Sequence, residues 1–400
     1  MFTQRCTNRA CSPKDKPKPF TSWFGLILFS ESESVYLRYK SPPMSAVHIP
    51  TLRLFNQKIT TNHFDTPQAL ITHLGAVQAQ DYPMSKWAFG VRLPKSADAT
   101  IEAALDAGEL VRTHVLRPTW HIVSGQDVRW MLALTSKYIK ASAAIRDRDL
   151  GIDSALYTRT NDLIAKALEG GKNLTREEIM QELEKGGVET NSSRAVHFMM
   201  NAELDGIACN GVIRDKKQTY ALLDEKVKPG LVLSREEALA NLAGRYFNSH
   251  APATLQDFQW WSGLSMSEAR IGLESIKSRL ESFESGGKTY FMAESTQLAA
   301  PEASVFFLPA FDEYTVSYKD RSTVFDPQWH KNAITSNGIF KPIIVRDGLV
   351  IGIWKRTVQK NKVVVEVEFF DSADALEQGV MEKAVAGFGR FLGLEVVLRG

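Results

Sequence analysis

The sequence predicts a mixed α+β protein made of tandem winged-helix units, each a helix-turn-helix plus a β-hairpin, followed by a mixed β-rich C-terminal region. Two observations predict this. One order of segments, three helical patterns and then a hairpin, recurs along the chain. Residues 301–400 instead carry period-two alternation that is typical of strands. The expected parts are a leader at 1–48, winged-helix units at 49–150, 151–230 and 231–300, and an α+β region at 301–400.

Composition is that of an ordinary globular protein. The chain has 400 residues, 44% of them hydrophobic, and 48 Lys+Arg against 46 Asp+Glu give a formal net charge of +2. This balance disfavours a polybasic nucleic-acid binder but leaves room for local basic faces. No apolar run reaches the ~18 residues that a membrane span requires, so no membrane partner is expected. Cys209 is the only cysteine after residue 48, which favours a reduced, cytoplasmic protein.

The leader at 1–48 is expected to lie outside the fold, either disordered or not translated. A start of translation at Met44 explains it best. A targeting segment is an alternative, because a basic stretch precedes the apolar run Phe20–Phe29, but no cleavage site follows. A disordered tail is the other alternative.

In the first unit, Pro67–Leu74 and Thr100–Ala107 have helical patterns, and the extended stretch Leu110–Val123 is the candidate wing. The second unit is clearest. Its helices are expected at Leu156–Gly170, after a capping box in Leu174–Glu178, and at Asn191–Leu204. Three helices and a hairpin form the winged-helix plan, whose third helix enters the DNA major groove. A packing unit without a ligand is the alternative.

The hairpin of the second unit pairs Ile207–Ile213 with Thr219–Leu223. In the third unit we expect helices at Ser234–Tyr246, after Thr254, and at Ser265–Leu280, and then a hairpin with a Gly-Gly turn.

In the C-terminal region, the first two of three alternating strands are joined by an Asp-Gly turn, and an amphipathic helix and a last strand follow. The expected segments are Phe340–Arg346, Leu349–Lys355, Lys362–Phe370, the helix Asp374–Leu392 and the strand Leu394–Leu398. We interpret them as an α+β cap on the winged helices.

Familiar catalytic motifs are missing from the sequence. It has no phosphate-binding glycine loop, no Gly-x-Ser-x-Gly elbow and no His-Glu-x-x-His helix. His114 and His121 have no cysteine or carboxylate at metal-ligand spacing. We therefore expect no metal and no cofactor.

Two polar clusters stand out. Gln78 and Gln80 follow the first helix at spacing i, i+2, so their side chains point the same way if the segment is extended. Taken alone, a polar turn is the simpler interpretation. Arg112, His114, Arg117 and His121 lie in one extended segment, which has more donors than a plain buried strand needs; a solvated wing with paired charges is the alternative.

Six segments in family order resemble the tandem winged-helix DNA glycosylases of the AlkZ type, which unhook interstrand crosslinks and excise bulky N7-alkylpurines. The segments are Val77–Asp81, Arg112–His121, Trp261–Leu264, Leu308–Tyr314, Tyr318–Arg321 and Gly352–Arg356. The resemblance runs from about Pro50 to the C-terminus. Pro118 departs from it, since relatives often have Gly there, and this leaves the shape of the wing open.

The resemblance implies a monofunctional DNA glycosylase, a hydrolase of N-glycosidic bonds, in which Gln78 and Gln80 are catalytic. It places double-stranded DNA as the partner. The residues expected to contact phosphates are Arg112, His114, Arg117, His121, Arg194, Lys216, Lys217 and Arg321. Three winged helices in one chain also remove the need for a dimer, so a monomer is expected.

The implied chemistry agrees with the residues. A guanine alkylated on N7 is already cationic and departs without a general acid, so the site must only orient water and stabilise an oxocarbenium-like sugar. The amide oxygens of Gln78 and Gln80 suit both tasks. Asp81 adds negative potential or caps a helix. A non-enzymatic winged-helix regulator and a structural protein that uses its winged helices for protein contacts are the alternatives.

Overall fold

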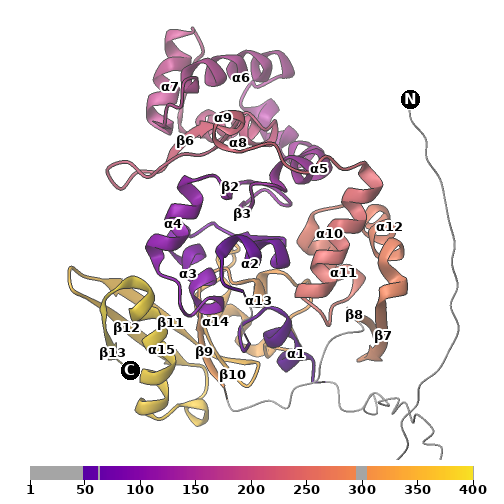
Figure 1. Ribbon diagram of the computed structural model, residues 1–400, viewed down its shortest axis with the longest axis vertical. Helices are drawn as coiled ribbons and strands as arrows, with labels where there is room; N and C mark the ends of the chain where they lie inside the picture. The colour runs from indigo at the N-terminus through magenta and orange to yellow at the C-terminus, as the bar shows by residue number, and fades with distance from the viewer. Residues whose placement is uncertain (1–47, 62–63, 294–303, 400) are drawn as a thin grey trace, which may run out of the picture. The chain divides into compact units, whose positions relative to one another are not determined.

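The computed structural model describes residues 48–61, 64–293 and 304–399. The expectations about the leader, including a start at Met44, therefore lie almost wholly outside the described residues. Within them the fold is mixed α+β, as predicted, with small sheets and a larger C-terminal sheet (Figure 1). One order of elements occurs three times: a helix, a short extended segment, two helices and two strands.

The first group follows helix α1 (Ile49–Asn56) and forms a three-stranded antiparallel sheet in the order β1-β3-β2. Its elements are α2 (Pro67–Leu74), β1 (Ala76–Gln78), α3 (Tyr82–Arg92), α4 (Asp98–Asp106), β2 (Leu110–His114) and β3 (Trp120–Ser124). The two helices predicted here are confirmed as α2 and α4.

Two features of the first group differ from the expectation. Helix α3 was missed, because Pro83 usually interrupts a helix. Here Pro83 lies in the first turn, where no N–H donor is required, and Asp81 caps the helix. The stretch at 110–123, the candidate wing, is extended as expected but is not one continuous segment. It is two strands, because Leu116 adopts a left-handed conformation (φ +64°) and turns the chain while its side chain stays buried.

Helix α5 (Val128–Asp149) leads to the second group, whose three predicted helices are all present. The elements are α6 (Ser154–Leu168), β4 (Leu174–Thr175), α7 (Arg176–Lys185), α8 (Ser192–Leu204), β5 (Ala208–Asn210), β6 (Thr219–Leu222) and the short α9 (Leu223–Lys226). The predicted capping box joins Thr175 and Glu178. This group has an apolar core of its own around Ile164, Ile179 and Phe198.

The third group repeats the plan with a two-stranded hairpin, and Ala253 bridges to Phe291 beside it. The elements are α10 (Arg235–Ser249), α11 (Leu255–Ser262), α12 (Met266–Ile276), a 3-10 turn at Lys277–Arg279, β7 (Leu280–Ser285) and β8 (Lys288–Ala293). The predicted Gly-Gly turn is confirmed, since Gly286 and Gly287 both have positive φ.

The C-terminal region forms a five-stranded sheet in the order β13-β12-β11-β10-β9. Its elements are β9 (Val305–Leu308), α13 (Glu313–Val316), α14 (His330–Ala333), β10 (Ile343–Arg346), β11 (Leu349–Val358), β12 (Lys362–Phe369), α15 (Gln378–Leu392) and β13 (Glu395–Arg399). Only the β12–β13 pair is parallel. Because α15 contacts both edge strands, β9 and β13, the sheet curls around it as a half-barrel.

Two apolar cores join the first group to other parts of the chain. In one, Trp87 of α3 packs on Phe388 and Phe391 of α15. In the other, Val123 of β3 belongs to the same core as Trp261 of α11. Strand β1 and helix α13, which lie between these cores in contact with each other, carry the candidate site. None of the helices in the described ranges is long and apolar enough to cross a membrane.

Candidate active site

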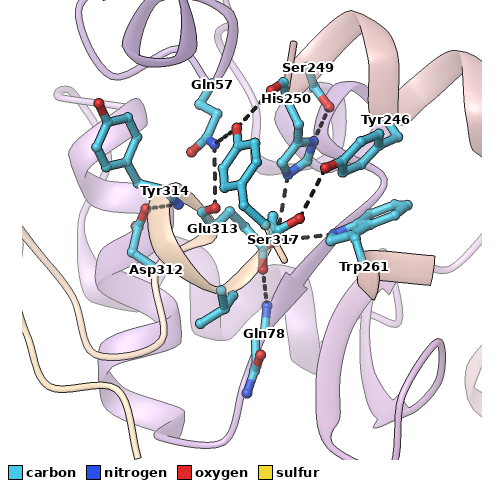
Figure 2. A network of polar contacts seen from close by, with 12 residues as sticks. Gln57, Gln78, Tyr246, Ser249, His250, Trp261, Asp312, Glu313, Tyr314 and Ser317 are labelled. Atoms are coloured by element: carbon cyan, nitrogen blue, oxygen red, sulfur yellow. Dashed lines mark hydrogen bonds and ion pairs between the residues drawn. The ribbon is translucent and has the colours of Figure 1, made fainter. Parts of the chain in front are cut away.

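Gln78 is the last residue of β1, at the edge of its sheet. Its neighbours Val77 and Ala79 are fully buried, and the N–H of Ala79 donates to the carbonyl of Trp120 at 2.7 Å. Alternation along the strand turns the N–H of Gln78 away from β3. It donates instead to Oε1 of Glu313 at 2.7 Å, as Figure 2 shows.

Glu313 begins helix α13 and is completely buried. Its second oxygen, Oε2, accepts hydrogen bonds from Nε1 of Trp261 at 3.1 Å and from the hydroxyl of Ser317, and it lies 3.6 Å from Nε2 of His250 (Figure 2). Burial alone would raise the pKa of this carboxyl, but His250, Arg117 and the Ser317 hydroxyl outweigh it and hold the pKa below its usual value. The group is therefore an anion at neutral pH.

Arg117 holds the side chain of the same glutamine. Its Nη2 donates to Oε1 of Gln78 at 3.0 Å, and its Nη1 donates to the carbonyl of Val316 at 3.1 Å. Burial lowers the pKa of Arg117, and the charge of Glu313 opposes that shift. Helix α13 therefore contacts Gln78 in two ways. Its first residue, Glu313, bonds the main-chain N–H directly, and its last residue, Val316, holds Arg117, which bonds the side-chain amide.

Side chains from outside helix α13 donate hydrogen bonds to its main-chain carbonyls. The carbonyl of Thr315 accepts from Nε of Arg321 at 2.7 Å, and the carbonyl of Val316 also accepts from Nε1 of Trp260 at 3.0 Å. Asp312, which caps the helix, forms a buried bidentate ion pair with Arg92. Nη1 and Nη2 of Arg92 each lie 2.9 Å from a carboxylate oxygen of Asp312. The helix is thus fixed at both ends, which makes it a rigid support for Gln78.

The second glutamine has a different environment. Gln80 is exposed, two residues beyond Gln78 in the bend that precedes α3. Asp81 next to it accepts the N–H of Met84 at 3.1 Å as the cap of α3 and pairs with Arg356 at 3.4 Å. Of the two roles expected for Asp81, the capping role is confirmed.

Arg112 is buried and bonded inside the protein. Its Nε donates to the carbonyl of Ala79 at 3.0 Å, and its Nη1 donates to Oε1 of Gln218 at 2.9 Å. The guanidinium also lies over the rings of Tyr82 and Trp120. Arg112 therefore ties the β5–β6 connection to the main chain between the two glutamines.

The two histidines of this hairpin are buried as well. His114 pairs with Glu203 through Nδ1. His121 donates from Nδ1 to the carbonyl of Thr119 at 2.9 Å, and burial, aided by the charge of Arg117, lowers its pKa to about 3. His121 is therefore neutral at neutral pH and cannot offer a charge to a phosphate.

The remaining basic candidates differ in their exposure to solvent. Lys216 and Lys217 are exposed at the tip of the β5–β6 connection, and Arg194 is half-buried in the first turn of α8, 3.5 Å from Glu189. Arg321 is half-buried against the rings of Trp260 and Phe340, and its Nη2 has no hydrogen-bond partner among the described residues.

The structure thus brings Gln78 and Arg117 together and places Lys216, Lys217 and Arg194 in the second group. Glu313 and His250 were missed as site residues. Glu313 had a signal: an Asp-Glu pair interrupts the apolar stretch 305–316, and acids in a buried segment need a specific reason. No such signal marked His250. In the described parts of the chain, no group of three or more His, Cys, Asp or Glu is placed to hold a metal ion.

Comparisons with known proteins agree with this architecture. A family profile described as "DNA glycosylase AlkZ-like" matches residues 71–391. An interstrand DNA cross-link repair glycosylase from Streptomyces sahachiroi is 23% identical over 343 residues, which cover 81% of this chain and 90% of that protein. The solved structure of the Streptomyces sahachiroi DNA glycosylase AlkZ has a similar fold, with a TM-score of 0.73 at 20% identity, covering 88% of this chain and 98% of that one.

Proposed function

Because the chain belongs to the AlkZ-like family of DNA glycosylases, we propose that it releases cationic N7-alkylated purines from duplex DNA by hydrolysing their N-glycosidic bonds. The observation that supports this proposal is that two hydrogen bonds fix Gln78: Glu313 accepts from its main-chain N–H, and Arg117 donates to its side-chain amide oxygen. A neutral amide fixed this firmly is suited to orient a nucleophile rather than to exchange a proton.

In the proposed reaction, Gln78 and Gln80 are the catalytic residues and water is the nucleophile. The purine carries its positive charge before the bond breaks, so it leaves without protonation. An amide oxygen has two lone pairs, and Arg117 occupies one on Gln78, which leaves one to accept from the water. Both amide oxygens would face the positive charge that develops on the sugar.

We infer the lesion class from this chemistry. The described site offers no general acid for an uncharged leaving group, since Glu313 is ionised and His121 is neutral. Undamaged purines should therefore be poor substrates. Interstrand crosslinks joined through purine N7 present the same cationic leaving group on each strand, so we propose them as substrates as well.

We also propose that the three repeated groups are winged helices and that duplex DNA lies against them, with the protein acting as a monomer. In the second group α8 would be the recognition helix and the β5–β6 connection the wing. We assign phosphate contacts to the exposed Lys216 and Lys217, and to the half-buried Arg194 and Arg321. Arg112, His114 and His121 are buried and bonded internally, so we assign them to the support of the hairpin and the glutamine segment.

The test is release of free base. A duplex that contains N7-methylguanine is incubated with the purified protein, and the released base is quantified by mass spectrometry alongside an undamaged duplex. We expect rapid release of N7-methylguanine and none of guanine. Tight binding to one undamaged sequence without release of any alkylated base would instead favour a regulator.

A further inference from the structure

Strand β1 is an edge strand, and the N–H of its last residue, Gln78, has no partner within the sheet. A peptide N–H on a sheet edge that is shielded from water needs a partner, because an unpaired one costs about as much as a lost hydrogen bond. The N–H of Gln78 faces this requirement, and Gln78 is only 7% exposed. The side chain of Glu313 meets it at 2.7 Å.

An ionised carboxylate is a costly way to satisfy one N–H. Burying such a charge costs several kcal/mol unless opposite charges and donors compensate. Here the second oxygen has its own donors, Trp261 and Ser317, with His250 at 3.6 Å. The carboxylate that these groups stabilise is bonded to the main chain of Gln78. Buried ionisable groups with strongly shifted pKa values are common at functional sites.

The contacts of helix α13 restrain Gln78 at both of its ends. Glu313 bonds the main-chain N–H, and the carbonyl of Val316 holds Arg117, which bonds the side-chain oxygen. With both ends held, the direction of the free amide lone pair is set before DNA binds. Such preorganisation matters because a displacement of about 1 Å can slow a reaction about 100-fold.

We propose that Glu313 is a positioning residue for base release: its carboxylate fixes the edge of β1 so that the amide of Gln78 is aimed at the attacking water. This inference rests on the proposed function, in which Gln78 is catalytic. Glu313 itself does not touch the substrate in this proposal. It acts through the main chain of Gln78 alone.

Two substitutions distinguish the effect of the length of the Glu313 side chain from the effect of its charge. Glu313→Asp keeps the charge but shortens the side chain by one methylene, which withdraws the carboxylate from the N–H of Gln78. Glu313→Gln keeps the length and an oxygen acceptor but removes the charge. We expect Glu313→Asp to lower the single-turnover rate at saturating protein about 10- to 100-fold. We expect Glu313→Gln to retain the rate within about 5-fold, although its amide leaves Trp261 without an acceptor and lowers the melting temperature.

The measurements distinguish positioning from general damage to the fold. For each variant, the rate of N7-methylguanine release, the Kd for the damaged duplex and the melting temperature are determined on the full chain. Glu313→Asp should change the rate but leave the Kd within about 2-fold. Asp127→Asn is the matched control, because Asp127 is another buried carboxylate, bonded to Arg245 and Trp130. It should lower the melting temperature without slowing release.

Three results would overturn the inference: a wild-type rate in Glu313→Asp, a rate in Glu313→Gln as low as in Glu313→Asp, or an equal loss of rate in Asp127→Asn. If Glu313→Asp does not fold, Glu313→Gln decides alone, and a rate more than about 10-fold below wild type rejects the proposal. Failure of the unaltered protein to release any N7-alkylated base is a different result, and it would reject the proposed function and this inference together.

Discussion

The guanidinium of Arg117 donates to the amide oxygen of Gln78 across 3.0 Å, so the orientation of that amide is fixed by the β2–β3 hairpin rather than by the glutamine itself. The same guanidinium reaches Val316 with its other nitrogen. A planar group with two diverging donors is needed to bridge both acceptors, and an ammonium group lacks that geometry.

Arg117→Lys should therefore slow base release about 10-fold or more while retaining the positive charge. Binding of the damaged duplex should change by no more than about 3-fold, because the net charge is unchanged. Arg346→Lys is the control, since Arg346 pairs with Asp374 in the C-terminal region. Rates and affinities measured on both variants check this, and an unchanged rate in Arg117→Lys would show that the amide does not depend on the guanidinium.

Gln78→Ala and Gln80→Ala should each abolish base release and leave DNA affinity nearly intact, because in the proposed reaction the amides act in the transition state and not on phosphates. The two variants should differ in stability. Gln80 is exposed, so its loss should leave the melting temperature unchanged, whereas Gln78→Ala removes a bonded, buried amide and should lower it by a few degrees. Full activity in Gln80→Ala would remove Gln80 from the catalytic pair.

Gly263→Ala should destabilise the protein by about 3 kcal/mol, because strain and overpacking add. Gly263 has φ +68°, and a Cβ there would lie 2.0 Å from the carbonyl oxygen of Leu116, next to Arg117. Base release should slow as well. Gly151 has φ +65° with no atom within 4 Å of such a Cβ, so Gly151→Ala should cost only about 1 kcal/mol. Urea unfolding of both variants measures the difference, and equal losses would contradict the close contact.

Replacing Lys216 and Lys217 together with Ala should reduce the dependence of binding on salt. Each phosphate contact contributes ~0.9 to the slope of log affinity against log salt, so the slope should fall by up to about 2. The loss should be equal for unrelated duplexes. A control that replaces two other exposed lysines, Lys166 and Lys383, removes the same charge. An equal change of slope in the control would place the effect in net charge rather than in contacts.

Stability should fall as the solution becomes acidic. Burial lowers the pKa of His121 to about 3 and that of His73 to about 4, while both have values near 6.5 when unfolded. Below pH 6.5 the unfolded chain therefore binds protons that the folded chain does not, and stability is lost as the pH falls from 6.5 towards 3. For His121 the loss at pH 5 is about 2 kcal/mol.

The pH effect is checked by urea unfolding at pH 7.5 and pH 5. His121→Asn keeps a donor for the carbonyl of Thr119 but cannot titrate, so its stability should change less between the two pH values than that of the wild type. Parallel losses in the two proteins would show that His121 does not contribute.

Local signals in the sequence predicted most of the helices and one half of the candidate site. The capping box of Thr175 and the Gly-Gly turn at Gly286 are decided by residues a few positions apart, and both were predicted. Gln78 was found through its motif. Helix α3 was not predicted, because a proline is compatible with a helix only in its first turn and the start of this helix was not recognised. Its cap, Asp81, also had an equally good alternative role.

The other half of the site depends on tertiary contacts that no local pattern encodes. Glu313 acts at Gln78 only because α13 packs against β1, and an acid in an apolar stretch does not name its partner. The burial of Arg112 and His121 has the same origin. Both were expected to face phosphates, and in the structure both are enclosed by elements that lie elsewhere in the sequence.

The hydrogen bond between Gln78 and Glu313 joins residues that are 235 positions apart. During synthesis the glutamine leaves the ribosome long before the acid that anchors it. A growing chain that carries Gln78 but not yet Glu313 lacks the hydrogen bond that holds the main chain of this glutamine. The candidate site can therefore be assembled only after residues 313–317 have been synthesised and have packed against β1.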